Sequence, residues 1–370
     1  MREPQSDTPR IHVLGVGNLG RLFAHALANS PNPPPISLLL HRSSLLEEWE
    51  QAGRKITITT NGVVNSIGQF DVEEITSASA PSTPVSNLVL ATKTINTLSA
   101  LRSISHRLNS NSTVLFAQNG MGTIDETDSQ VFTNNSTRPN YLTCITSHGV
   151  FDTGPFSSVH AGQASISIGR SLQRPPPTSP STAQYLIDKV LEALILAAKE
   201  YPSEELLFLQ LEKLVINAII NPLTAILSCR NGELLDKGPI VKVMRLLLQE
   251  TAQVIQLLPE ISSSDDPSVA DRFSTQKLEV KVLDVAEKTS KNTSSMLQDV
   301  RAGRQTEIEY INGWIVKKGR EQGVECEHNA KLVEMVKGAK KIGIDELRDL
   351  FAGPGGTFGV ADAIVDVVKP

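Results

Sequence analysis

A glycine pattern near the N-terminus, Gly15-Val16-Gly17-Asn18-Leu19-Gly20, constrains the fold of this chain more than any other feature. It follows an apolar run that predicts a buried parallel strand over 11–15, and it opens a predicted helix over 18–29. Glycines at this spacing allow a tight turn and the close approach of a pyrophosphate, to which the helix N-terminus offers free N–H groups. The pattern predicts a dinucleotide-binding β-α-β unit; the alternative is an accidental glycine turn.

The first half of the sequence alternates apolar segments with helical patterns, which is typical of a doubly wound α/β sheet. Further strands are predicted at residues 36–40, 55–64, 66–72, 88–91, 113–116, 141–146 and 164–168. The Pro-rich segment 174–180 is predicted to be a loop, because proline donates no backbone hydrogen bond. A predicted helix over 183–199 then ends at Tyr201-Pro202.

The second half is helical by pattern. Helices are predicted at residues 204–227, 239–257, 269–286, around Leu297, 307–322 and 330–340. We therefore predict an α/β fold, with an N-terminal Rossmann-type doubly wound sheet followed by an all-helical C-terminal domain. The predicted domains are residues 1–203, which bind the nucleotide, and residues 204–370, which form the substrate and catalytic domain and a C-terminal tail beyond about residue 343.

Length and composition are consistent with two domains. The 370 residues exceed the ~250–300 at which a single core stops growing. A formal net charge of −5 gives no basic field for nucleic acid or an anionic membrane, and three scattered cysteines have no zinc spacing, so no metal site is predicted. The N-terminus has no apolar signal segment, and the longest apolar stretch is interrupted by Asn217, Asn221 and Pro222. We expect a cytoplasmic protein, with a mitochondrial location still open.

The end of the second predicted strand indicates which dinucleotide binds. NAD enzymes place Asp or Glu there to hold the ribose 2′-hydroxyl. Here the strand ends in Leu40-His41-Arg42-Ser43-Ser44, and the first carboxylate is Glu47. A guanidinium beside hydroxyl groups suits a 2′-phosphate, so the sequence favours NADP(H) bound through Arg42. The alternative is that Arg42 is a solvated surface arginine.

A polar stripe on an otherwise apolar helix is the second decisive feature. Lys213, Asn217 and Asn221 are spaced four residues apart and therefore share one face of the predicted helix 204–227. The other positions are almost all apolar, which predicts a buried helix. Burying an ammonium and two amides without partners costs several kcal/mol, so they must meet protein groups, water or a polar ligand. The alternative to a ligand site is a structural network in which Lys213 pairs with a carboxylate.

Carboxylates for such a pair occur in one later segment. Asp299 and Glu307 are predicted to lie two helical turns apart on one side of a helix. Arg301 and Arg304 lie nearby, so a solvated charged face is the alternative for this segment.

Taken together, these segments resemble the ketopantoate reductase family, the NADPH-dependent 2-dehydropantoate 2-reductases. The resemblance covers roughly residues 11 to 340. It is carried by GVGNLG at 15–20, ATK at 91–93, QNGMGTIDE at 118–126, TSH at 146–148, KLVINAIINPLTAILSCRNGEL at 213–234 and SSMLQDVRAGRQTEIEYINGWIV at 294–316.

The resemblance implies a role for each matching residue. Those implied to bind the cofactor NADP(H) are Gly15, Val16, Gly17, Asn18, Leu19, Gly20, Arg42, Lys93, Asn119, Val150 and Glu307. Those implied to bind the substrate are Lys213, Asn217, Asn221, Asn231 and Ser295. Lys213 is implied to be the general acid and Glu307 the second catalytic residue, with Asp299 as support.

The implied reaction is hydride transfer to the C2 ketone of 2-dehydropantoate, which gives pantoate for pantothenate and coenzyme A synthesis. Two alternatives stay open: reduction of another branched 2-oxo acid, and a non-catalytic dinucleotide-binding regulatory protein. The expected partner is a small 2-oxo acid, with neither nucleic acid nor membrane, and a homodimer is a possible assembly. Insertions at 31–35, 127–137 and 174–180 and the tail exceed the family pattern without removing a motif residue.

Overall fold

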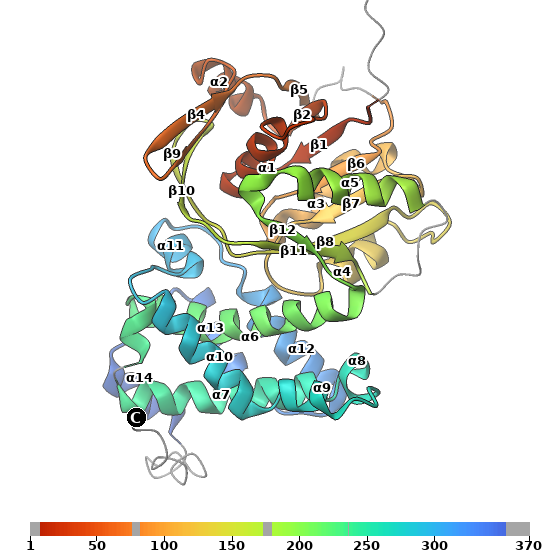
Figure 1. Ribbon diagram of the computed structural model, residues 1–370. Helices are drawn as coiled ribbons and strands as arrows, with labels where there is room; N and C mark the ends of the chain where they lie inside the picture. Colours follow the sequence, from red (N-terminus) through yellow and green to blue (C-terminus); the bar gives the residue numbers. More distant parts are fainter. Residues whose placement is uncertain (1–7, 76–81, 173–179, 236, 353–370) are drawn as a thin grey trace, which may run out of the picture. The chain divides into compact units, whose positions relative to one another are not determined.

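The computed structural model describes residues 8–75, 82–172, 180–235 and 237–352, which form two compact units (Figure 1). The N-terminal unit comprises residues up to 118 together with 122–209, and the C-terminal unit comprises 119–121 together with 210 onward. Most of the Pro-rich segment and the tail beyond residue 352 lie outside the described residues.

The N-terminal unit is built on a mixed sheet with the strand order β12-β11-β8-β7-β6-β1-β2-β5. The bounds are β1 (Ile11–Leu14), β2 (Ile36–Leu40), β5 (Asp71–Glu74), β6 (Asn87–Leu90), β7 (Thr113–Phe116), β8 (Asn140–Thr146), β11 (Ile166–Arg170) and β12 (Ala198–Glu200). The six neighbouring strands β8, β7, β6, β1, β2 and β5 run parallel to one another, whereas β11 pairs antiparallel with β8. The predicted Rossmann-type α/β domain is thus confirmed.

Helices cover both faces of this sheet because its central strands are apolar on both sides. The helices are α1 (Asn18–Ala28), α2 (Ser43–Gln51), α3 (Thr97–Ile104), α4 (Thr123–Gln130) and α5 (Pro180–Glu192), with short 3₁₀ turns at Thr94–Asn96, Ser105–Arg107 and Leu194–Leu196. One core joins the sheet to α1 and α5, through residues such as Phe23 and Ile187. The second joins it to α3 and α4, through residues such as Leu101 and Ile124.

A smaller sheet in the same unit has the order β4-β3-β10-β9. Its strands are β3 (Ile56–Thr60), β4 (Val63–Ile67), β9 (Gly149–Gly154) and β10 (Ser157–Gly162). The turn between β3 and β4 falls at Asn61-Gly62, where both residues have positive φ (52° and 78°), as a tight hairpin requires. The predicted strands 55–64 and 66–72 were therefore wrong in their bounds, and the hairpin of β9 and β10 was not predicted.

The helix predicted over 183–199 was also wrong at its end. Helix α5 stops at Glu192, and Ala197 takes a left-handed conformation with φ 44°. Residues 198–200 then pair with β11 at the sheet edge, so tertiary pairing overrides their helical pattern. At the other end, Pro180 begins α5 rather than lying in a loop, which suits a residue without a backbone N–H.

The described part of the C-terminal unit is helical. Its helices are α6 (Ser203–Leu227, counted from Gln210), α7 (Gly238–Gln256), α8 (Pro259–Ser262), α9 (Pro267–Arg272), α10 (Thr275–Lys288), α11 (Ser295–Arg301), α12 (Asn312–Gln322), α13 (Glu327–Lys337) and α14 (Ile344–Phe351), with 3₁₀ turns η4 (Asn231–Leu234) and η5 (Ile308–Tyr310). Helix α7 contacts α10, α12, α13 and α14. The predicted helix 269–286 is two helices, because Ser274 interrupts it and caps α10 by accepting from the backbone N–H of Lys277.

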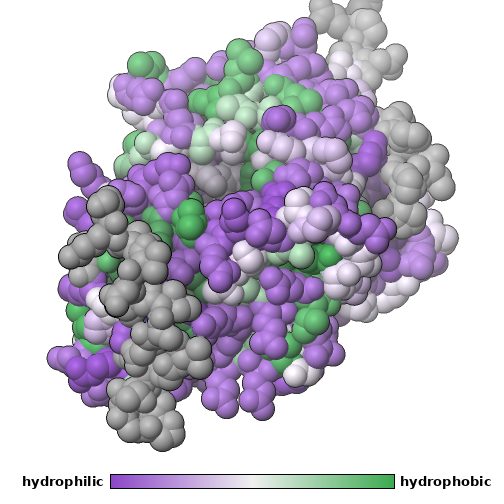
Figure 2. Space-filling view, turned by 60° about the horizontal axis from the view of Figure 1, so that its bottom comes forward, coloured by the Kyte–Doolittle hydropathy of each residue, from purple (hydrophilic) through white to green (hydrophobic). Residues whose placement is uncertain are grey.

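Helix α6 has the length and apolarity of a membrane-crossing segment, with a mean hydropathy of 1.4 over its most apolar window. However, 67% of that window is buried inside the protein, as in a core helix. On the face seen in Figure 2, hydrophilic side chains predominate and hydrophobic ones form small separate groups.

Candidate active site

The glycine loop joins β1 to α1, and its three glycines meet different surroundings. Gly15 has φ 98°, and a Cβ there would lie 2.5 Å from the backbone nitrogen of Thr92. A Cβ on Gly20 would lie 1.9 Å from the carbonyl oxygen of Gly15. At Gly17 a Cβ would meet nothing within 4 Å. Gly15 and Gly20 are therefore required by the fold, whereas Gly17 leaves the loop open to a ligand.

Strand order places this loop at the switch point of the sheet. On one side β1 pairs with β2, and on the other it pairs with β6, to which the chain returns after β5, so the strand order reverses at β1. The carboxyl ends of β1 and β6 carry the glycine loop and the segment Ala91-Thr92-Lys93, at the place where open α/β sheets bind ligands. Gln118, beyond β7, fixes this segment by donating to the carbonyl oxygen of Thr92 at 3.1 Å and to Oγ1 of Thr97 at 2.6 Å.

The start of α1 is held by polar contacts with the smaller sheet. Asn18 accepts a hydrogen bond from Oγ of Ser158 at 3.0 Å. The buried Arg21 donates to the carbonyl oxygen of Val16 at 3.0 Å and pairs with Asp152 at 2.5 Å. These contacts fix the helix N-terminus that faces a predicted phosphate.

The remaining cofactor residues predicted in this unit are more exposed. Arg42 is the N-cap residue of α2, its side chain is 58% exposed, and its nearest carboxylate is Glu48 at 3.8 Å. Lys93 precedes the 3₁₀ turn after β6 and is partly exposed. Val150 lies in β9 opposite His160, packed against the sheet core.

In the C-terminal unit, three predicted residues form a chain of side-chain contacts. Nζ of Lys213 donates to Oδ1 of Asn119 at 2.8 Å, and Nδ2 of Asn119 donates to Oε2 of Glu307 at 3.2 Å. The amide therefore uses its acceptor on the ammonium and its donor on the carboxylate. All three side chains are partly buried. The structure thus brings the two predicted catalytic residues to opposite sides of one amide.

The backbone around Asn119 explains how it reaches this position. The N–H of Met121 donates to the carbonyl oxygen of Tyr310 at 2.8 Å. Gly120 has φ 84°, and a Cβ there would lie 2.5 Å from the same carbonyl oxygen, so only glycine allows this approach. Tyr310 lies in η5, three residues after Glu307. One short contact thus sets both Asn119 and Glu307.

The predicted substrate residues lie on or near α6. Lys213, Asn217 and Asn221 share one helical face, of which Asn221 is buried and the other two are partly exposed. Asn231 begins η4 and is buried; its Nδ2 donates to Oγ1 of Thr289 at 2.9 Å, while its Oδ1 has no partner among the described residues. Ser295 is exposed at the first position of α11.

The start of α11 is joined to α6 by two hydroxyl groups that were not predicted. Oγ of Ser294 lies 2.7 Å from Oγ1 of Thr224, and it also caps α11 by accepting from the N–H of Leu297. Thr224 bonds in turn to the carbonyl oxygen of Ile220. The signal for this contact in the sequence is the Ser-Ser pair before a helix, of which only Ser295 is a predicted substrate residue.

The prediction that Asp299 and Glu307 share a helical face was wrong. Asp299 lies in α11, where it pairs with Arg304 at 3.0 Å. Helix α11 ends at Arg301, and Glu307 lies outside a helix, immediately before η5. Gly303, which lies between them, takes a left-handed conformation with φ 65°, so no helix joins the two residues.

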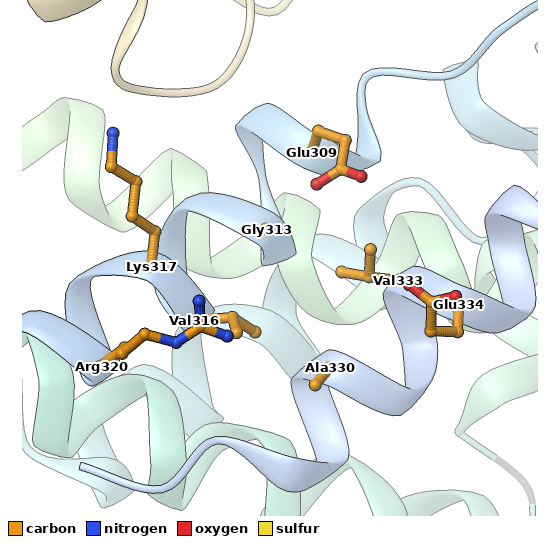
Figure 3. A pocket seen from close by; sticks show the side chains of 8 residues that line it. All are labelled: Glu309, Gly313, Val316, Lys317, Arg320, Ala330, Val333 and Glu334. Atoms are coloured by element: carbon orange, nitrogen blue, oxygen red, sulfur yellow. The ribbon is translucent and has the colours of Figure 1, made fainter. Parts of the chain in front are cut away.

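A cavity of about 290 Å³ lies elsewhere in the C-terminal unit, between α12 and α13 (Figure 3). Its lining residues are Glu309, Gly313, Val316, Lys317, Arg320, Ala330, Val333 and Glu334. None of these is a predicted site residue, and Glu309 is paired with Lys337 at 2.7 Å. The candidate site therefore rests on the contacts of Lys213 and the glycine loop, and not on this cavity.

Comparisons with known proteins identify the family of this chain. The family profile described as "Ketopantoate reductase PanE/ApbA" matches residues 11–173, and "Ketopantoate reductase PanE/ApbA C terminal" matches residues 206–340. Ketoisovalerate reductase BEA2 of Gibberella fujikuroi is 34% identical, over 85% of this chain and 79% of that protein. The 2-dehydropantoate 2-reductase of Saccharomyces cerevisiae is 30% identical, over 86% of this chain and 89% of that protein.

A solved structure shares the fold. The ternary structure of D-mandelate dehydrogenase with NADH and anilino(oxo)acetate matches with a TM-score of 0.73 and 22% identity, over 91% of this chain and 99% of that chain. The sheet, the glycine loop and these matches define an oxidoreductase with a Rossmann-type domain and a helical domain. The chain belongs to the ketopantoate reductase family.

Proposed function

We propose that this protein catalyses the NADPH-dependent reduction of 2-dehydropantoate to pantoate. The observation that carries the proposal is the pair of hydrogen bonds by which Asn119 links Lys213 to Glu307, in a member of the ketopantoate reductase family. An ammonium held by an amide, with a carboxylate on the far side of that amide, suits a proton donor that must keep its orientation.

Bound NADPH supplies the hydride that adds to C2 of the ketone. The protein's task is to supply the proton to the carbonyl oxygen, so that the ketone becomes a secondary alcohol. The ammonium of Lys213 donates this proton and stabilises the negative charge that develops on the oxygen. Asn119 fixes the direction of the N–H bonds, and the negative charge of Glu307 favours a positive charge at this position.

The residues of the N-terminal unit fit NADP(H). Gly17 has open space where a pyrophosphate would approach, and α1 directs its first N–H groups to the same place. Arg42 is exposed at the end of β2, and no residue of β2 itself is acidic. D-mandelate dehydrogenase binds NADH on the same fold, so the choice of cofactor depends here on Arg42.

The substrate has one serious alternative, because a fungal relative at 34% identity is a ketoisovalerate reductase. 2-Dehydropantoate differs from ketoisovalerate by a hydroxymethyl group. The buried Oδ1 of Asn231 lacks a partner among the described residues and is suited to accept from that hydroxyl. We therefore favour 2-dehydropantoate, since a site built to bond a hydroxyl discriminates strongly against an analogue that lacks it.

Oxidation of NADPH by the purified protein, followed at a series of concentrations of each acid, tests the proposal. We expect kcat/KM for 2-dehydropantoate to exceed that for ketoisovalerate by at least about fivefold, because leaving one buried group without its hydrogen bond costs about 1 kcal/mol or more. The variant Asn231→Ala should reduce this ratio. A ratio in favour of ketoisovalerate would establish the second activity, and no turnover with either acid would contradict both. A cytoplasmic location and a homodimer remain proposals, to be tested by fractionation and light scattering.

A further inference from the structure

We infer that Asn312 is a positioning residue for the proton donor, which it serves by replacing a backbone hydrogen bond that Pro222 removes from α6. The inference rests on the proposed function of Lys213. It starts from an interruption in the helix that carries Lys213, Asn217 and Asn221.

Pro222 lies inside α6, which continues past it to Leu227. Proline has no N–H, so the carbonyl oxygen of Ala218, four residues earlier, loses its helical partner. Ala218 is fully buried, and water therefore does not replace the bond. Instead, Nδ2 of Asn312 donates to this carbonyl oxygen at 2.9 Å. A side chain from α12 thus completes the backbone hydrogen bonding of α6.

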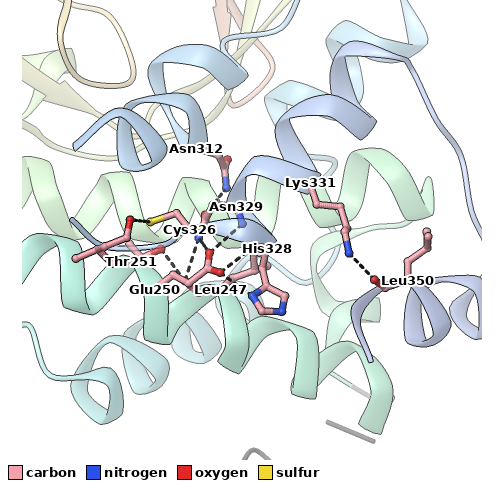
Figure 4. A network of polar contacts seen from close by, with 10 residues as sticks. Leu247, Glu250, Thr251, Asn312, Cys326, His328, Asn329, Lys331 and Leu350 are labelled. Atoms are coloured by element: carbon pink, nitrogen blue, oxygen red, sulfur yellow. Dashed lines mark hydrogen bonds and ion pairs between the residues drawn. The ribbon is translucent and has the colours of Figure 1, made fainter. Parts of the chain in front are cut away.

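Asn312 is itself held by a buried polar network (Figure 4). Its Nδ2 also donates to Oδ1 of Asn329 at 2.9 Å, and Nδ2 of Asn329 donates to Glu250 at 2.7 Å. The Glu250 carboxylate accepts further from the ring of His328 at 2.6 Å and from the backbone N–H groups of residues 328 and 329. Because the network ends on the Glu250 carboxylate, which accepts from several donors, Asn329 is held in place and keeps its Oδ1 directed at Asn312.

The position of this contact ties it to the active site. Ala218 lies five residues after Lys213, and Asn312 lies five residues after Glu307. Helix α6 and the segment 307–312 are therefore joined twice, once through Asn119 and once through Asn312. Loss of the Asn312 contact leaves the carbonyl oxygen of Ala218 without its donor, so this part of α6 can turn or shift relative to the segment 307–312.

The test uses three variants. Asn312→Leu removes the donor at similar volume, Pro222→Ala restores an N–H to Ala218, and the double variant combines the two. A shift of Lys213 away from its productive position should lower kcat of Asn312→Leu by about 10- to 100-fold, with KM for NADPH unchanged. Pro222→Ala in the same protein should return kcat to within about threefold of the Pro222→Ala variant alone.

A second readout does not depend on turnover. Amide hydrogen exchange of the peptide covering residues 213–221 should be faster in Asn312→Leu and should return towards the wild-type rate in the double variant. If the wild-type enzyme reduces no 2-oxo acid, the proposed function fails, and hydrogen exchange alone decides the positioning role.

Two outcomes would overturn the inference. The first is a folded Asn312→Leu protein with wild-type kcat and exchange rates. The second is a double variant that stays as inactive, or as unfolded, as Asn312→Leu, which would show that Asn312 acts through Asn329 and not through Ala218.

Discussion

Nζ of Lys213 lies 2.8 Å from Oδ1 of Asn119, a residue 94 positions earlier in the chain. The contact joins two segments that are far apart in the sequence: Asn119 follows strand β7, and Lys213 lies on helix α6. It gives the ammonium a fixed direction, which a proton donor needs before substrate arrives.

Removal of this ammonium is the first test of the site. Lys213→Ala should lower kcat by about 10²–10⁴, the usual contribution of a general acid. NADPH affinity should change little, because the glycine loop and Arg42 belong to the other unit. Lys317→Ala, which removes an exposed lysine of the cavity between α12 and α13, is the matched control and should keep wild-type kcat. Near-normal turnover by a folded Lys213→Ala protein would remove Lys213 from the mechanism.

Under the proposed function, Arg42 decides between NADPH and NADH. Arg42→Ala should weaken NADPH binding by about 1.5–3 kcal/mol, the value of a hydrogen bond to a charged group, and should leave NADH binding nearly unchanged. Fluorescence titration with both nucleotides measures the difference. Arg102→Ala, which removes an exposed arginine of α3, serves as the control for a general loss of positive charge. Equal losses for the two nucleotides would place Arg42 away from the 2′-phosphate.

Two glycines of the loop should affect different properties, Gly17 the binding of the nucleotide and Gly20 the stability of the fold. Gly17→Ala should keep its melting temperature, because the new methyl group meets nothing within 4 Å, yet it should weaken NADPH binding by obstructing the pyrophosphate. Gly20→Ala should destabilise the protein severely, because its methyl group would lie 1.9 Å from a carbonyl oxygen. Calorimetry and nucleotide titration distinguish the two. Unchanged affinity in Gly17→Ala would argue against a dinucleotide at this loop.

Acid stability should depend on Glu73 in β5. Its contact with His12, and then the guanidinium of Arg107 at 2.8 Å, lower the pKa of Glu73 to about 2. A carboxyl group with a lowered folded pKa contributes stability that is present above its unfolded pKa of about 4.5 and is lost as pH falls through about 2. The shift corresponds to about 3 kcal/mol. Glu73→Gln should therefore lower the unfolding free energy at pH 7 and flatten its dependence on pH between 4.5 and 2. Parallel curves for both proteins would contradict this.

The sequence predicted the elements whose local pattern and tertiary role agree. The glycine loop was predictable because its conformation needs glycine at Gly15 and Gly20, and the stripe on α6 because its spacing is helical. Strand β12 was not, since its residues pair only after β11 offers a free edge. Asn119 was named through a family resemblance alone, because nothing in its own segment points to α6.

Asn312 was missed although a signal existed. A proline within a strongly apolar helix leaves a buried carbonyl unpaired, so some buried donor had to be present elsewhere in the chain. The sequence indicates that a donor is required but does not identify it, because Asn312 lies 94 residues away from Ala218.

Residues Asn119–Met121 belong to the helical unit, so that unit is made of two segments that are separate in the sequence. A fragment that starts at Gln210 contains Lys213 and Glu307 but lacks Asn119, whose side-chain amide joins them. A fragment that ends at Leu209 contains Asn119 without either partner. Recombination between relatives at the apparent domain boundary therefore separates residues that must remain mutually compatible. The unit of exchange that preserves the site is the helical half together with this tripeptide.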